Sequence, residues 1–188
     1  LRGLPGLFGL LWYYAIVNFF LSLSGVLIGP MILSFASEVE LGIAQMAGGA
    51  AMLAGGVLMG TWGGPKNSKI PSVIGAIGLS GLGYMLMGLR PAIAIIAIGQ
   101  FIFLFFIPIS AALSQAVWQV KIPADIQGRV FAIRGMIAHA IIPLANLAAG
   151  PLADRIFEPM MASGGILSTS FIATLIGTGP GRGIGLIF

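Results

Sequence analysis

Charged side chains divide this chain into long uncharged intervals. The intervals cover residues 3–37, 41–65, 70–89, 91–120 and 135–153. A helix needs about 20 apolar residues to cross the hydrocarbon core of a bilayer. We therefore predict membrane-spanning helices over residues 9–35, 41–62, 70–89, 92–118 and 130–152, with the start of a last span at residues 183–188.

The expected fold class is an all-α membrane protein, built as a helical bundle. A membrane β-barrel needs strands of about ten residues that alternate in polarity, whereas these intervals are longer and continuously apolar. Residues 159–181 are also uncharged but rich in Ser, Thr and Gly, so we expect a loop with a short helix there. Because the chain starts without Met and stops inside an apolar run, we interpret it as a fragment.

Composition agrees with a surface that faces lipid. Only 7% of the residues are charged and 58% are hydrophobic, whereas soluble domains carry about 25% charged residues. The net charge of +4 is scattered and forms no basic stripe, which argues against a nucleic-acid partner. With no cysteine, one histidine and few carboxylates, we expect no metal site, no cofactor and no enzymatic activity.

Basic residues fall unevenly on alternate loops. One set of loops carries six of them, namely Arg2, Lys66, Lys69, Lys121, Arg129 and Arg134. The other set carries three, which are Arg90, Arg155 and Arg182. The positive-inside rule assigns the first set to the cytoplasm, so the first span is expected to run outward.

Polar and small residues recur at helical spacing in four of the five spans. The main members are Tyr14, Asn18 and Ser22 in the first span, Gln45 and Met52 in the second, Gln100 and Gln115 in the fourth, and His139 and Asn146 in the fifth. A polar group in hydrocarbon is costly unless it meets a partner or water. The stripes therefore either line a substrate cavity, with the third span outside it, or form helix–helix contacts. Small-residue pairs typical of such contacts are Gly56 with Gly60 and Ala145 with Ala149.

His139 is the ionisable residue deepest in a predicted span. Such a residue is a candidate for handling a proton or substrate, although a neutral His bonded to a neighbouring helix is the alternative. No Asp or Glu lies at membrane depth. A carboxylate that carries protons would then belong to the missing part of the protein.

The loop from Lys121 to Arg134 has the pattern of a structured elbow. Pro123 is expected to open a helix, with Asp125 in its first turn and able to pair with Arg129. This loop serves either as a membrane-edge anchor or as a gate at the cytoplasmic side. The gate candidates are Lys66, Lys69, Asp125, Gly128 and Arg129.

Three segments carry a resemblance to a known family. They are GTWGGPKNSK at residues 60–69, IPADIQGRVFA at 122–132 and PLANLAAGPLADR at 143–155. With the span count, they resemble the C-terminal half of a major facilitator superfamily transporter, in the branch of macrolide-efflux and enterobactin exporters. The first segment departs from the family pattern because it lacks the family's Asp.

The resemblance implies a twelve-helix fold that works by alternating access. Here the spans would be helices seven to eleven and the start of twelve, in a bacterial-type inner (plasma) membrane. The implied function is export of antibiotic-like or siderophore-like amphipathic molecules, with the proton as coupling ion. The expected partners are this small-molecule substrate, the lipid bilayer and the missing N-terminal half. The alternative is a non-transporting or degenerate membrane module, either alone or fused to a biosynthetic enzyme.

Overall fold

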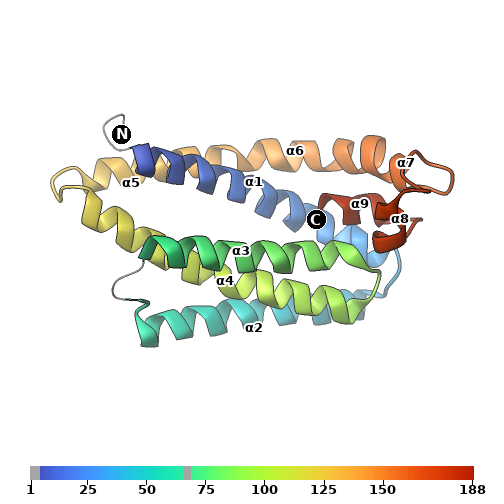
Figure 1. The fold of residues 1–188 in the computed structure, drawn as a ribbon, viewed down its shortest axis with the longest axis horizontal. Helices are drawn as coiled ribbons and strands as arrows, with labels where there is room; N and C mark the ends of the chain where they lie inside the picture. Colours follow the sequence, from blue (N-terminus) through green and yellow to red (C-terminus); the bar gives the residue numbers. More distant parts are fainter. Residues whose placement is uncertain (1–4, 66–68) are drawn as a thin grey trace.

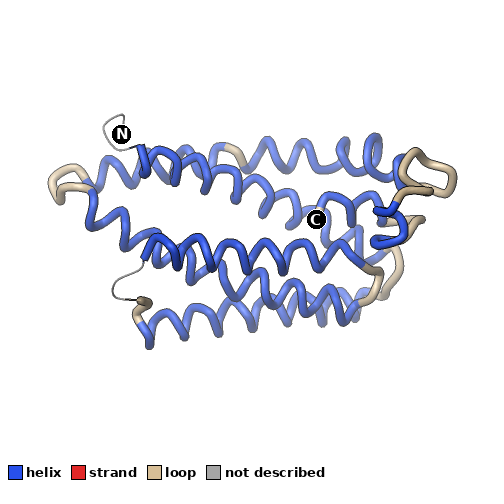
Figure 2. Tube along the Cα trace, viewed as in Figure 1, coloured by secondary structure: helices blue, strands red, loops and turns tan. Residues whose placement is uncertain are grey.

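The computed structural model describes residues 5–65 and 69–188, and this part of the chain is helical and contains no strand (Figures 1 and 2). The first four long helices are α1 (Pro5–Leu33), α2 (Glu38–Trp62), α3 (Lys69–Leu89) and α4 (Ile93–Lys121). A fifth, broken helix consists of α5 (Gln127–Ala140), α6 (Ile142–Leu152), the π-helix η1 (Ala153–Phe157) and α7 (Glu158–Met161). Two short helices follow, α8 (Phe171–Ile176) and α9 (Arg182–Ile187). The predicted all-α fold class is confirmed.

Five stretches of the described helices are long and apolar enough to cross a membrane. They are Leu11–Leu33, Glu38–Trp62, Ile70–Leu89, Ile93–Lys121 and Gln127–Met161, and they overlap the five predicted ranges. Many large apolar side chains point outward, among them Leu53 and Leu147, which are 73% and 75% exposed. Such a surface is stable when lipid tails cover it.

The long helices form two groups that lie side by side in Figure 1. In the first group, α4 packs against both α2 and α3, and in the second, α1 packs against α5 and α6. Glycines allow the close contacts in the first group. A side-chain carbon on Gly83 of α3 would lie only 2.5 Å from the backbone nitrogen of Phe103, and one on Gly55 of α2 would collide with the carbonyl of Phe105.

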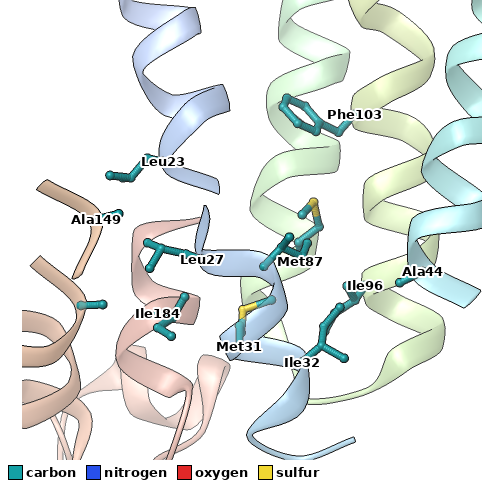
Figure 3. Close-up of a cluster of buried hydrophobic side chains, with 12 residues drawn as sticks. Leu23, Leu27, Met31, Ile32, Ala44, Met87, Ile96, Phe103, Ala149 and Ile184 are labelled. Atoms are coloured by element: carbon teal, nitrogen blue, oxygen red, sulfur yellow. The ribbon is translucent and has the colours of Figure 1, made fainter. Parts of the chain in front are cut away.

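The two groups meet in a buried apolar cluster near α9. Leu27 and Met31 of α1 lie there between Ile184 of α9 and Met87 of α3 (Figure 3). Ile96 of α4 is also fully buried in this cluster. Since the cluster draws on both groups, it joins them at the end of the bundle that carries α7, α8 and α9.

The fifth helix is interrupted where the sequence predicted one continuous span. Pro143 has no N–H to donate to the carbonyl of His139, which is the normal helical partner four residues earlier. The N–H of Ile141 bonds that carbonyl instead, so α5 ends at Ala140 and α6 begins at Ile142.

The elbow between α4 and α5 also differs from its predicted form. Pro123 lies in a turn rather than at a helix start, because its carbonyl accepts the N–H of Ile126 at 3.2 Å. The helix begins at Gln127, whose Nε2 donates to the carbonyls of Gln119 and Ile122, both at 2.9 Å. This amide closes the turn.

Candidate functional site

A cavity of about 340 Å³ lies between α1, α4 and α5. Its polar lining residues are Tyr14, Asn18, Ser110, Gln115, Arg134 and His139. The rest of its wall is mainly apolar and includes Val17, Leu21, Ile107 and Phe131. The cavity therefore offers both hydrogen-bonding groups and apolar surface to a molecule that enters it.

Tyr14 spans the cavity wall from α1 to α4. Its hydroxyl donates to the backbone carbonyl of Ser110 at 2.8 Å. One turn further along α1, Nδ2 of Asn18 donates to the carbonyl of Tyr14 at 2.8 Å. The Oδ1 atom of Asn18 has no hydrogen bond to a described residue, so it remains available as an acceptor.

Arg134 of α5 lies close to two aromatic rings. Its Cζ atom is 5.5 Å from the ring centre of Tyr14 and 5.1 Å from that of Trp118, which are distances typical of cation–π contacts. Nη1 donates to Oε1 of Gln115 at 2.8 Å, and Nη2 lies 3.4 Å from Oγ of Ser114. These aromatic and neutral polar contacts hold the guanidinium at the edge of the cavity.

His139 is held by its own helix. Its Nδ1 lies 2.7 Å from the carbonyl oxygen of Gly135. A carbonyl only accepts, so Nδ1 must carry the proton. In the neutral ring Nε2 is then an acceptor, and it has no hydrogen bond to a described residue.

The structure brings four of the sequence-based cavity candidates together and places five elsewhere. Tyr14, Asn18, Gln115 and His139 line the cavity. The residues outside its lining are Ser22, Gln45, Met52, Gln100 and Asn146. Gln100 is buried and its Nε2 donates to Oε1 of Gln45 at 3.0 Å, so this pair joins α4 to α2. Met52 and Asn146 are exposed, and Ser22 is half-buried.

The gate candidates lie apart from the cavity lining. Asp125, Gly128 and Arg129 are exposed at the elbow, and neither Asp125 nor Arg129 forms an ion pair with a described residue. Lys66 lies outside the described residues. Lys69 is the first residue of α3, but its side chain is also outside the described part.

Arg134 and Ser110 are polar cavity residues that sequence reasoning missed, and Arg134 is the charged one. We assigned it to the cytoplasmic loop charges, and removing it leaves five basic residues in that set against three in the other. One feature of the sequence could have distinguished Arg134 from an ordinary loop charge. Its helical neighbours three and four positions away, Val130, Phe131, Ile137 and Ala138, include no acid that could pair with it.

A second cavity, of about 460 Å³, lies where α1 faces α3, α4 and the end of α9. Its walls are mostly apolar and aromatic, with Phe20, Tyr84 and Phe188 among them. In the part of the chain that the structure describes, no group of three His, Asp or Glu residues comes together to hold a metal ion. The polar groups of this second cavity are hydroxyls of Tyr and Ser, whereas the first cavity also holds amide, imidazole and guanidinium groups.

Comparisons with known proteins give a distant likeness to two proteins of the same name. No protein-family model and no solved structure matches the chain. Macrolide efflux protein A from Streptococcus pyogenes, and the protein of the same name from its serotype M6, are each 28% identical to this chain over 127 residues. The aligned part covers 64% of this chain and 30% of each relative, so the chain spans less than a third of their length. Five membrane-spanning helices and this likeness together identify an integral membrane protein.

Proposed function

We propose that this chain is part of a secondary exporter of small amphipathic molecules. The observation that carries the proposal is the cavity between α1, α4 and α5, which presents polar groups within helices that cross a membrane. The likeness to proteins named for macrolide efflux supports the same function class. In this proposal the chain is the C-terminal half of a major facilitator superfamily transporter in a bacterial inner membrane.

The lining of the cavity suits an amphipathic substrate. Phe131, Ile107 and Leu21 provide apolar surface, and Asn18 and His139 provide hydrogen-bonding atoms. Pockets for small molecules typically combine a mostly apolar wall with a few fixed polar groups. Binding would therefore rest on apolar contact, with the polar atoms selecting the orientation.

The arrangement of the helices suits alternating access. The buried cluster near α9 joins the two helix groups at one end of the bundle. A second buried cluster, with Leu11, Trp118 and Ile122 among its members, joins α1 to α4 at the elbow end. The cavity lies along α1 and α4 between these two clusters. Transporters of this kind expose a central site to one side of the membrane and then to the other. The second half of the protein would complete the site and supply the opposing wall.

Export is tested by measuring compound accumulation in cells. Cells that make the complete protein are compared with cells that carry an empty vector, using a panel of macrolides, catecholate siderophores and other amphipathic compounds. We expect lower accumulation of at least one compound, and we expect an uncoupler that dissipates the proton gradient to abolish the difference. Equal accumulation of every compound in the two strains would refute the proposal.

Proton coupling is tested at His139. Histidine is the side chain best suited to change protonation near neutral pH, and the other ionisable side chains that line its cavity are Tyr14 and Arg134. We expect His139→Ala to flatten the dependence of export on external pH, because the substitution removes the imidazole that would carry the proton. Met136→Ala, at an exposed position of the same helix, should keep the wild-type profile. An unchanged profile in His139→Ala would remove this residue from the coupling mechanism.

A further inference from the structure

The charge of Arg134 is only partly compensated by the protein. Two of its N–H groups face Gln115 and Ser114, out of the five that a guanidinium carries. The Nε–H and one N–H on each terminal nitrogen therefore have no acceptor among the described residues. An unpaired charge that is partly removed from water is costly, and neutral acceptors and aromatic faces offset only part of that cost.

The cavity contains no acid that could neutralise this charge. Among its lining residues Arg134 is the one with a permanent charge, and none is Asp or Glu. Arg182 provides a contrast within the same chain. It is 2% exposed and packs on the ring of Phe35, so the surrounding protein encloses it. Arg134 is half-buried and opens onto the cavity.

We infer that Arg134 binds the carboxylate of the transported molecule, and that the cavity prefers amphipathic carboxylic acids over neutral or cationic analogues. The inference rests on the proposed function and names its substrate class. A guanidinium forms paired, charge-assisted hydrogen bonds with a carboxylate, which are stronger and more directional than bonds between neutral groups. A cationic amine would instead meet a cavity whose permanent charge is positive.

The neighbouring groups fit a carboxylate attached to an apolar body. The rings of Tyr14 and Trp118 both lie within 5.5 Å of the guanidinium carbon, and Gln115 accepts a hydrogen bond from one of its N–H groups. The apolar wall at Phe131 and Ile107 would receive the body of the ligand. Arg134 would therefore set specificity, while the wall provides most of the contact area.

The inference is tested with two matched fluorescent probes, dansylglycine and its methyl ester, which differ in the negative charge. The complete protein is placed in nanodiscs of zwitterionic lipid, and each probe is titrated by fluorescence against empty nanodiscs. We expect the acid to bind at least about tenfold more tightly than the ester, as a charge-assisted hydrogen-bonded pair provides. In Arg134→Met we expect acid binding to fall to the level of the ester.

Three controls separate charge recognition from damage to the fold. Binding of the ester should be unchanged in Arg134→Met, which shows that the cavity is intact. Arg134→Lys should keep part of the preference for the acid, because the charge remains but the planar fork is lost. Arg155→Met removes the same charge at an exposed site in η1, which lies beyond α6 in the broken helix, and should keep the full preference.

Equal affinity of the wild-type protein for acid and ester would overturn the inference. That result is also expected if a carboxylate from elsewhere in the complete protein pairs with Arg134. The inference would also be overturned if Arg134→Met still bound the acid more tightly than the ester. The same holds if Arg134→Lys bound the acid and the ester equally. Failure of this inference can be distinguished from failure of the proposed function, because the binding experiment requires neither a proton gradient nor transport. A protein that prefers the acid but exports nothing refutes export alone.

Discussion

At the residue scale, Tyr14 makes the most informative contact of the cavity. Its hydroxyl reaches the carbonyl of Ser110 in the other helix group, and its ring lies against the guanidinium of Arg134. One side chain thus links α1 to both α4 and α5. The hydroxyl forms the hydrogen bond and the ring forms the contact with Arg134. A substitution that removes only the hydroxyl therefore tests the hydrogen bond alone.

We predict that Tyr14→Phe lowers the free energy of unfolding by about 0.6–1 kcal/mol, because it removes one hydrogen bond within a membrane bundle. The ring contact with Arg134 is retained. Unfolding of the complete protein by denaturant in detergent micelles measures the change. Tyr13→Phe is the matched control, since the Tyr13 hydroxyl forms no hydrogen bond with a described residue. A loss of the same size in both variants would contradict this role of the Tyr14 hydroxyl.

Spacing identified part of the cavity from the sequence alone. Tyr14 and Asn18 are four residues apart in an apolar helix, and this pattern places two costly polar groups on one side. Arg134 escaped notice because it lies near the end of a predicted span, where basic residues are common as topology signals. Gln45 and Gln100 satisfy the same polar-stripe pattern but bond to each other, so their spacing marked a helix contact.

At the element scale, glycine decides how closely α3 and α4 approach. Gly75, Gly78, Gly81 and Gly83 repeat along α3, and of these Gly83 contacts α4, whereas the other three have open space where a side chain would lie. The pattern identifies faces on which small residues repeat. It does not say which face is turned toward a neighbour.

The small-residue pairs show the same limit of sequence reasoning. Ala145 and Ala149 are fully buried, in line with the packing interpretation. Gly56 and Gly60 have no neighbour within 4 Å, so that pair does not serve as a contact in this structure. The glycine of α2 that touches α4 most closely is Gly55.

We predict that Gly83→Ala lowers the free energy of unfolding by about 1–3 kcal/mol, because the new methyl group overlaps the backbone of α4. Gly75→Ala, in the same helix, should leave stability unchanged or raise it by up to about 1 kcal/mol through helix propensity. Thermal unfolding in detergent, followed by circular dichroism, compares the two variants. Equal stabilities would contradict the close packing of α3 on α4.

At the scale of the whole molecule, the charges along the chain predicted how many helices cross the membrane. Polar interruptions are costly in hydrocarbon, so uncharged intervals correspond closely to membrane helices. The placement of the helices relative to one another depends on side-chain packing. The cluster around Met31 joins α1 to α3 and α9, and no single apolar interval contains the information for that contact.

The account depends most on the claim that the cavity between α1, α4 and α5 is the path of an exported molecule. Ala111 and Ala112 are both exposed residues of α4, but Ala111 lines this cavity and Ala112 lies outside its lining. Replacing each with Trp therefore gives a matched pair, in which the first indole fills the cavity and the second points away from it.

The decisive measurement is the initial rate of export, in cells, of a compound that the complete protein removes, compared between Ala111→Trp and Ala112→Trp at equal protein levels. With substrate well below saturation, the account predicts a loss of about tenfold or more in Ala111→Trp, the change expected when at least about 1.4 kcal/mol of binding is lost. Ala112→Trp should export at the wild-type rate. Equal export by the two variants would contradict the claim.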